Sequence, residues 1–122
     1  MNAQEIMDYC LQKRGAYLNT PFGAEPVCVR IGKRIFAEIF LSRPWVTLKC
    51  EPLYGQAMRN AYPNGIRRGY HCPRAQQPYN NTVTLDGGVP DARLREMIDH
   101  SYTRALGTLT AAERAGALAR TP

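Results

Sequence analysis

The chain lacks any apolar run that approaches the roughly 20 residues of a membrane span, which argues against a transmembrane protein. Its first residues, MNAQEIMDYC, also lack the positive-then-apolar layout of a secretory signal peptide. We therefore expect a cytoplasmic protein with no membrane partner. A length of 122 residues with 44% hydrophobic content predicts a single domain over residues 1–122, large enough to bury one core.

The four cysteines include no Cys-x-x-Cys pair and lie about twenty residues apart, at Cys10, Cys28, Cys50 and Cys72. Zinc sites usually contain closely spaced cysteine or histidine pairs, and disulfides are rare in a reducing cytoplasm. We expect free, mostly buried thiols and no metal site.

Several features of enzymes are also missing. The chain has two histidines, no pair of neighbouring carboxylates suited to acid–base chemistry and no glycine-rich phosphate loop. Asp99, His100 and Ser101 are consecutive on a predicted helix, so their side chains point about 100° apart and cannot form a relay. We expect no catalytic residues, no enzyme activity and no cofactor.

Positive charge is concentrated in the middle of the chain. Between Arg30 and Arg74 there are nine basic and two acidic residues, a net charge of +7, against +6 for the whole protein. Thirteen of the sixteen basic residues are arginine, which favours bidentate contacts with phosphate. This distribution is typical of polyanion-binding proteins, although a solvated basic surface that binds nothing gives the same pattern.

The sequence pattern predicts helices from Asn2 to Gly15, over 52–61, from Asp91 to Leu106, and peripherally over 110–122. Capping boxes begin the first and last of these, at Asn2 with Glu5 and at Thr110 with Glu113. Strands are predicted over 26–31, 34–41, 45–50, 66–72 and 81–86. Because the connections between the early strands are short, these strands are antiparallel neighbours. The predicted fold class is α+β, with a two-layer, five-stranded antiparallel sheet, helices packed on one face and the order α-β-β-β-α-β-β-α-α.

Alternation along the strands divides their side chains between two faces. The face toward the helices is predicted to carry Val27, Val29, Ile31, Ile35, Ile39, Leu41, Val46, Leu48, Val83 and Leu85. The opposite face is predicted to carry Cys28, Arg30, Arg34, Phe36, Glu38, Phe40, Trp45, Thr47, Lys49, Arg67, His71, Thr82 and Thr84. Interleaved aromatic and cationic side chains can stack on bases while they contact phosphates. Alternatively, the last helix or a second subunit of a homodimer covers these aromatics.

Nine short strings, in order, resemble the MmcQ/YjbR-like family of small bacterial proteins. They are Pro21-Phe22-Gly23, Lys33 with Ile35-Phe36-Ala37, Leu48-Lys49-Cys50-Glu51-Pro52, Tyr62-Pro63, Gly69-Tyr70-His71, Asn81-Thr82-Val83, Leu85-Asp86-Gly87, Pro90-Asp91, and Ile98-Asp99 with Ser101-Tyr102. The match runs from about Met1 to Leu109. It implies the same two-layer architecture and DNA binding through paired hairpin wings.

The sequence departs from the family pattern at Tyr79 and Asn80, where relatives usually have His-Trp before Asn-Thr-Val. A ligand site that used this indole would be lost here. The family match at Ser101 and Tyr102 predicts a hydrogen bond from helix to sheet.

We predict a non-catalytic DNA-binding protein that contacts phosphates through a basic sheet and hairpin surface. The candidate nucleic-acid-binding residues are Arg30, Lys33, Arg34, Lys49, Arg67, Arg68, His71 and Arg74, and Arg43 lies at another hairpin tip. For Lys49 the alternative is a cross-strand pair with Glu38. Alternative functions are a protein-interaction module resembling secretion chaperones, with a protein partner, and a small-molecule binding or resistance protein.

Overall fold

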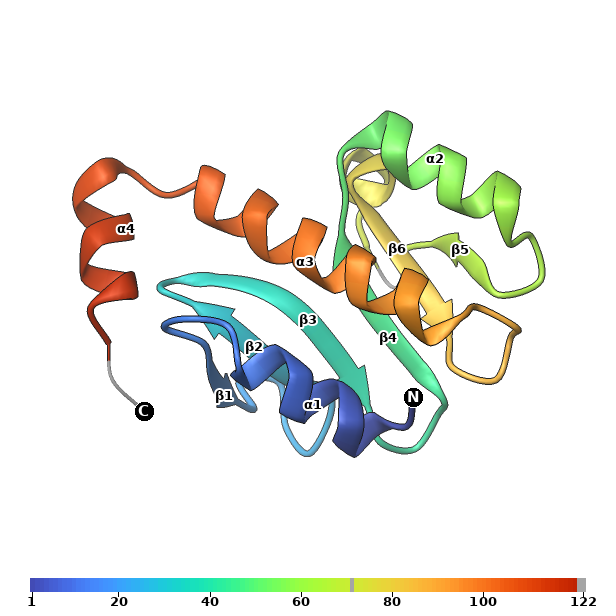
Figure 1. The fold of residues 1–122 in the computed structure, drawn as a ribbon, viewed down its shortest axis with the longest axis horizontal. Coiled ribbons are helices and arrows are strands. Elements are labelled where there is room, and N and C mark those ends of the chain that lie inside the picture. The colour runs from blue at the N-terminus through green and yellow to red at the C-terminus, as the bar shows by residue number, and fades with distance from the viewer. Residues whose placement is uncertain (71, 121–122) are drawn as a thin grey trace.

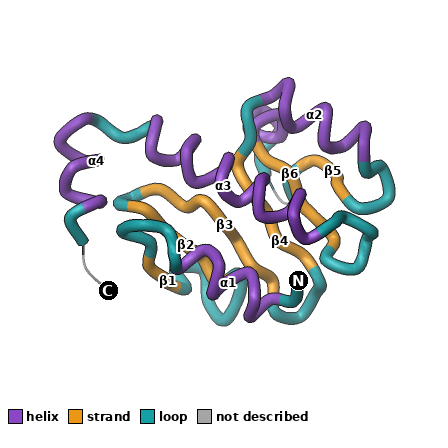
Figure 2. Tube along the Cα trace, viewed as in Figure 1, coloured by secondary structure: helices purple, strands orange, loops and turns teal. Residues whose placement is uncertain are grey.

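The computed structural model describes residues 1–70 and 72–120. Helices and strands follow one another along the chain as shown in Figures 1 and 2. The helices are α1 (Ala3–Leu11), α2 (Pro52–Ala61), α3 (Asp91–Gly107) and α4 (Ala111–Leu118), with a 3-10 helix η1 (Arg74–Tyr79). The strands are β1 (Tyr17–Asn19), β2 (Val27–Ile31), β3 (Arg34–Phe40), β4 (Trp45–Lys49), β5 (Ile66–Arg68) and β6 (Asn80–Thr84).

The sheet is antiparallel and open, with the strand order β1-β2-β3-β4-β6-β5. The α+β class is therefore confirmed, but the sheet has six strands instead of the predicted five. The additional strand, β1, is only three residues long, too short to give an alternating hydrophobic pattern. The predicted strand 66–72 was too long, because pairing ends at Arg68 and the Tyr70 amide instead donates to the Thr82 hydroxyl at 2.7 Å.

One hydrophobic core joins the helices to the sheet. It contains side chains from α1, α2, α3 and five strands, including Ile6, Met58, Leu94, Ile98, Val29, Ile39, Val46, Val83 and Ile66. Ala117 of α4 joins the same core at the end of the sheet, where α4 lies beside the β2–β3 turn (Figure 1). In the part of the chain that the structure describes, no helix is both long and apolar enough to cross a membrane.

Phe36 does not lie on the face predicted for it. Strand β3 has a bulge, because Val29 and Arg30 pair with Ala37 and Ile35 and leave Phe36 as an extra residue. A bulge interrupts the two-residue alternation, so strict counting from Glu38 fails at this point. Phe36 is buried and packs edge-on against Tyr102 of α3, with ring centroids 5.3 Å apart. Ile35, predicted on the helix face, shares its register position with Arg30 on the opposite face.

Both predicted capping boxes are present. Asn2 and Glu5 exchange hydrogen bonds at the start of α1, and Thr110 and Glu113 do so at the start of α4. Helix α2 begins with Pro52 at a first-turn position, where the missing N–H has no intrahelical partner to lose. The Glu51 carboxylate caps α2 by accepting hydrogen bonds from two amides of the first turn.

The Ser101 hydroxyl connects strands β3 and β4 at the point where they separate. Their register runs from Phe40 opposite Trp45 to Ala37 opposite Leu48 and continues no further. The next pair would be Phe36 and Lys49, and here Ser101 Oγ donates to the Phe36 carbonyl at 2.5 Å and accepts from the Lys49 amide at 2.8 Å. Ser101 is fully buried on α3, which crosses over both strands (Figure 1). The predicted helix-to-sheet hydrogen bond is thus present, and it satisfies two backbone groups at once.

Ser101→Ala should lower the free energy of unfolding by about 2 to 4 kcal/mol, because it leaves a buried amide and a buried carbonyl without a partner. Chemical denaturation measures this directly. Thr103→Ala is the matched control, since Thr103 lies exposed on the same helix, and its effect should stay within about 0.5 kcal/mol. A Ser101→Ala protein as stable as the control would show that the bridge contributes nothing.

Candidate functional site

Five side chains form an aromatic–arginine cluster on the sheet face opposite the helices: Phe40, Arg43, Trp45, Arg67 and Tyr70. The guanidinium carbon of Arg67 lies 4.0 Å from the centroid of the Trp45 ring, and that of Arg43 lies 4.8 Å from it. The Tyr70 ring meets Trp45 at 4.7 Å and Phe40 at 5.7 Å, both edge-on. Two cations therefore stack on one small aromatic surface.

The sheet register explains why these residues meet. Arg67 is opposite Thr82, Thr82 is opposite Thr47, and Trp45 is two residues from Thr47 on the same face. Thr47 and Thr82 are buried and share a hydrogen bond of 2.8 Å. Because Thr82 also accepts the Tyr70 amide, the segment after β5 is held against this face.

The arginines of the aromatic–arginine cluster form no close ion pair in the described residues, although the charge of Arg43 contributes to lowering the pKa of the Glu25 carboxyl, after the hydrogen bonds that this carboxyl accepts from Ser42. Among the residues that the structure describes, Arg43 and Arg67 form no ion pair, and Arg43 donates only to the Tyr70 hydroxyl, at 3.1 Å. Both side chains are exposed. A guanidinium stacked on a ring keeps its N–H groups at the edge, where they can contact an oxyanion.

Lys49 lies on the same face, half-buried at the end of β4. Burial lowers the pKa of its ammonium group, and the positive charges of Arg34 and Arg104 lower this pKa further. Burial also raises the pKa of the Glu38 carboxyl. Glu38 is opposite Thr47, and within residues 1–70 and 72–120 it forms no ion pair with Lys49. The two charges still interact, because each opposes the shift that burial causes in the pKa of the other.

Lys49 also lines a pocket of about 350 Å³, together with Gln76, Tyr79, Arg104 and Thr108. We refer to this as the Lys49 pocket. Its walls come from β4, from η1 and from the C-terminal end of α3 with the residue that follows it. The Cys50 amide donates to the Tyr79 carbonyl at 2.9 Å and so holds η1 beside the end of β4. Tyr79, where the sequence departs from the family pattern, is thus part of the pocket wall.

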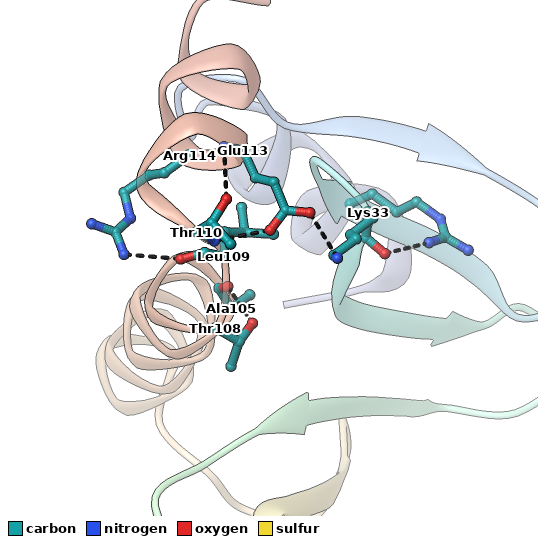
Figure 3. Close-up of polar contacts among 8 residues, drawn as sticks. Lys33, Ala105, Thr108, Leu109, Thr110, Glu113 and Arg114 are labelled. Atoms are coloured by element: carbon teal, nitrogen blue, oxygen red, sulfur yellow. Dashed lines mark hydrogen bonds and ion pairs between the residues drawn. The ribbon is translucent and has the colours of Figure 1, made fainter.

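Two of the predicted site residues serve the structure of the sheet end. Arg30 donates to the side chain of Asn19 and to the Lys33 carbonyl, both at 3.0 Å, which ties β1 and the β2–β3 turn together. Lys33 forms a 2.7 Å ion pair with Glu113 of α4 (Figure 3). Arg30 and Lys33 thus already have partners within the protein, and they lie near the edge of the sheet farthest from β5.

The remaining predicted residues differ in their surroundings. Arg68 and Arg74 are exposed, and Arg67 belongs to the aromatic–arginine cluster. Arg34 is half-buried near Lys49, and its Nε atom is buried without a hydrogen-bond partner in the described residues. His71 lies outside the described residues. The seven described candidates therefore do not form one continuous surface.

Two residues of the Lys49 pocket, Arg104 and Gln76, are not among the predicted site residues. Arg104 lies three positions after Ser101 on α3 and so emerges near the same helix face, next to the separated strands. The three-residue spacing from Ser101 is a sequence signal for Arg104, because Ser101 is itself predicted to contact the sheet. Gln76 had no such signal, since η1 was not predicted.

Three consecutive residues of α3, which the sequence predicts cannot form a relay, each have a separate partner. They are Asp99, His100 and Ser101. Asp99 pairs with Lys13 and accepts from the Tyr9 hydroxyl, and His100 Nε2 accepts the Glu51 amide at 2.9 Å. Ser101 bridges β3 and β4. All three side chains thus attach α3 to other elements.

The sequence model of the YjbR family matches residues 11–104, which is most of the chain and includes β2 to β6 and the bridging Ser101. The chain belongs to the YjbR family. This YjbR-family protein is 28% identical over 116 residues to the uncharacterized protein YjbR of Escherichia coli K12, covering 93% of this chain and 95% of that one. The family resemblance drawn from the nine strings is confirmed.

Solved structures agree with this assignment. A Deinococcus radiodurans protein with a DUF419 domain superposes with a TM-score of 0.85 at 28% identity, over 95% of this chain and 87% of that chain. A Pseudomonas syringae protein gives a TM-score of 0.72 at 20% identity, over 86% of this chain and 99% of that chain, and supports the fold.

Trp45 is the only tryptophan of the protein, so its fluorescence reports on the aromatic–arginine cluster. Arg67→Gln should raise the acrylamide quenching of Trp45, because it uncovers one side of the ring. It should also lower the free energy of unfolding by about 0.5 to 1 kcal/mol, the usual contribution of an exposed cation–π pair. Arg68→Gln, the matched control one residue away, should change neither quantity. Equal quenching in the two variants would contradict the stacking.

Proposed function

We propose that this YjbR-family protein is a non-catalytic DNA-binding protein, and that the aromatic–arginine cluster is the centre of its interface. One observation carries the proposal: Arg43 and Arg67 stack on Trp45, are exposed and form no ion pair among the described residues. A planar guanidinium can donate two parallel hydrogen bonds to a phosphate group.

Stacking also supports the proposal energetically. A free arginine side chain loses about 2 kcal/mol of rotamer entropy when it is fixed, but a guanidinium already held on a ring loses less on binding phosphate. Arg68, exposed at the end of β5, is adjacent in sequence and extends the positive surface. The aromatic–arginine cluster thus provides two cations, Arg43 and Arg67, and Arg68 adds a third at the end of β5.

This proposal changes the predicted interface. Arg30 and Lys33 are left out of it because their donors are used within the protein. The hairpin tip that contributes to the interface is instead the β3–β4 turn, which carries Arg43. The separate roles of Asp99, His100 and Ser101 in attaching α3 support a non-catalytic function.

If Arg43, Arg67 and Arg68 each contact one phosphate of duplex DNA, the plot of log affinity against log salt concentration should have a slope of about −2.7. Arg67→Gln should reduce the slope to about −1.8, because one fewer counterion is released. Fluorescence anisotropy of a labelled duplex over a series of salt concentrations measures both values.

The control is Arg95→Gln, which removes the same charge from an exposed position on α3. It should leave the slope at the wild-type value. An affinity that does not depend on salt, or an equal loss of slope in the two variants, would contradict the proposed interface.

A further inference from the structure

The Lys49 pocket is a second cationic site, separate from the aromatic–arginine cluster. It lies where β3 and β4 have parted, and its walls come from three elements that are distant in the sequence. Its volume of about 350 Å³ lies at the lower end of the range for small-molecule sites. Neither Trp45 nor an arginine of the aromatic–arginine cluster lines it.

The lining of the pocket carries positive charge, and its acidic neighbours Glu38 and Glu51 lie outside the lining. Lys49 and Arg104 line it, and Arg34 lies close enough to lower the pKa of the Lys49 ammonium. No acidic side chain is among the lining residues that the structure describes. The nearby carboxyl of Glu38 has its pKa raised by burial, and the charge of Lys49 opposes this shift.

The cations of this region also have donors that are not used. Over the described ranges, the Lys49 ammonium and the Arg104 guanidinium form no hydrogen bond or ion pair. Arg34 Nε is buried without a partner. Partly buried cations whose donors are unused are unfavourable, so Lys49 and Arg104 around one pocket, with Arg34 nearby, indicate a site for an anion.

The positive charge of the pocket and its neutral hydrogen-bonding side chains indicate which class of anion it binds. A carboxylate, with one negative charge, would leave the region with excess positive charge, whereas a phosphate monoester carries close to two at neutral pH. The side chains of Gln76 and Tyr79 supply neutral hydrogen-bonding groups at the pocket mouth, suited to the hydroxyls of an attached sugar.

We propose that the Lys49 pocket binds a phosphate monoester, with Lys49 and Arg104 contacting the phosphate and Gln76 and Tyr79 contacting the group that carries it. The inference is independent of the proposed DNA interface, because the two sites share no residue. The phosphate belongs either to a free sugar phosphate or to the 5′ end of a nucleic acid strand, and the test has an arm for each source.

The first arm is calorimetric titration with ribose 5-phosphate, with ribose as the probe that lacks the phosphate. We expect saturable binding of ribose 5-phosphate, no binding of ribose, and at least a tenfold loss of affinity in Lys49→Gln and in Arg104→Gln. Because Lys49 is half-buried, the melting temperature of the Lys49→Gln protein is compared with that of the wild type. If the Lys49→Gln protein is unstable, Arg104→Gln on helix α3 still tests the contact with the phosphate.

The second arm compares a short single strand that carries a 5′-phosphate with the same strand ending in a 5′-hydroxyl. A preference for the phosphorylated strand that is lost in Arg104→Gln supports the pocket and assigns the phosphate to a nucleic acid end. Arg67→Gln distinguishes the two sites, since it should weaken duplex binding and leave the phosphate preference unchanged. The inference is overturned if ribose 5-phosphate does not bind and the 5′-phosphate gives no preference, or if Arg104→Gln changes neither.

Discussion

The contact of Ser101 with two strands determines how the rest of the molecule is arranged. Strands β3 and β4 stop pairing beyond Ala37 and Leu48, and the next amide and carbonyl would be buried without partners if the Ser101 hydroxyl did not bind both. The contact fixes α3 over the separated strands and thereby places Arg104 beside Lys49. The sheet can then hold a polar pocket at a position where continuous pairing would have closed it.

The basic residues of the middle of the chain have three different roles. At the β2–β3 end, Arg30 and Lys33 tie the sheet to β1 and α4 (Figure 3). On β4, β5 and the β3–β4 turn, Arg43 and Arg67 stack on Trp45 and remain open to solvent. Between them, Lys49 and Arg34 are partly buried and form no ion pair among the described residues. A high local net charge therefore does not by itself identify a binding surface, because partners far away in the sequence decide which cations are available.

Much of the fold follows from local sequence signals. Capping boxes, Pro52 and the alternating strands predicted four helices and most of the sheet, because each depends on residues within a few positions. The bulge at Phe36, the short strand β1 and the end of β5 were not predicted, since they depend on register between strands. The same reason applies to the site: the ion pair of Lys33 with Glu113 joins residues 80 positions apart, and no local pattern indicates it.

Amide hydrogen exchange at Lys49 tests the central claim most directly, because this N–H has the buried Ser101 hydroxyl as its acceptor. We expect the Lys49 amide to exchange as slowly as that of Val46 in the paired part of β4, through global unfolding. Exchange at a rate typical of a frayed strand end would contradict the bridge, and with it the arrangement of Lys49 and Arg104 around a common pocket.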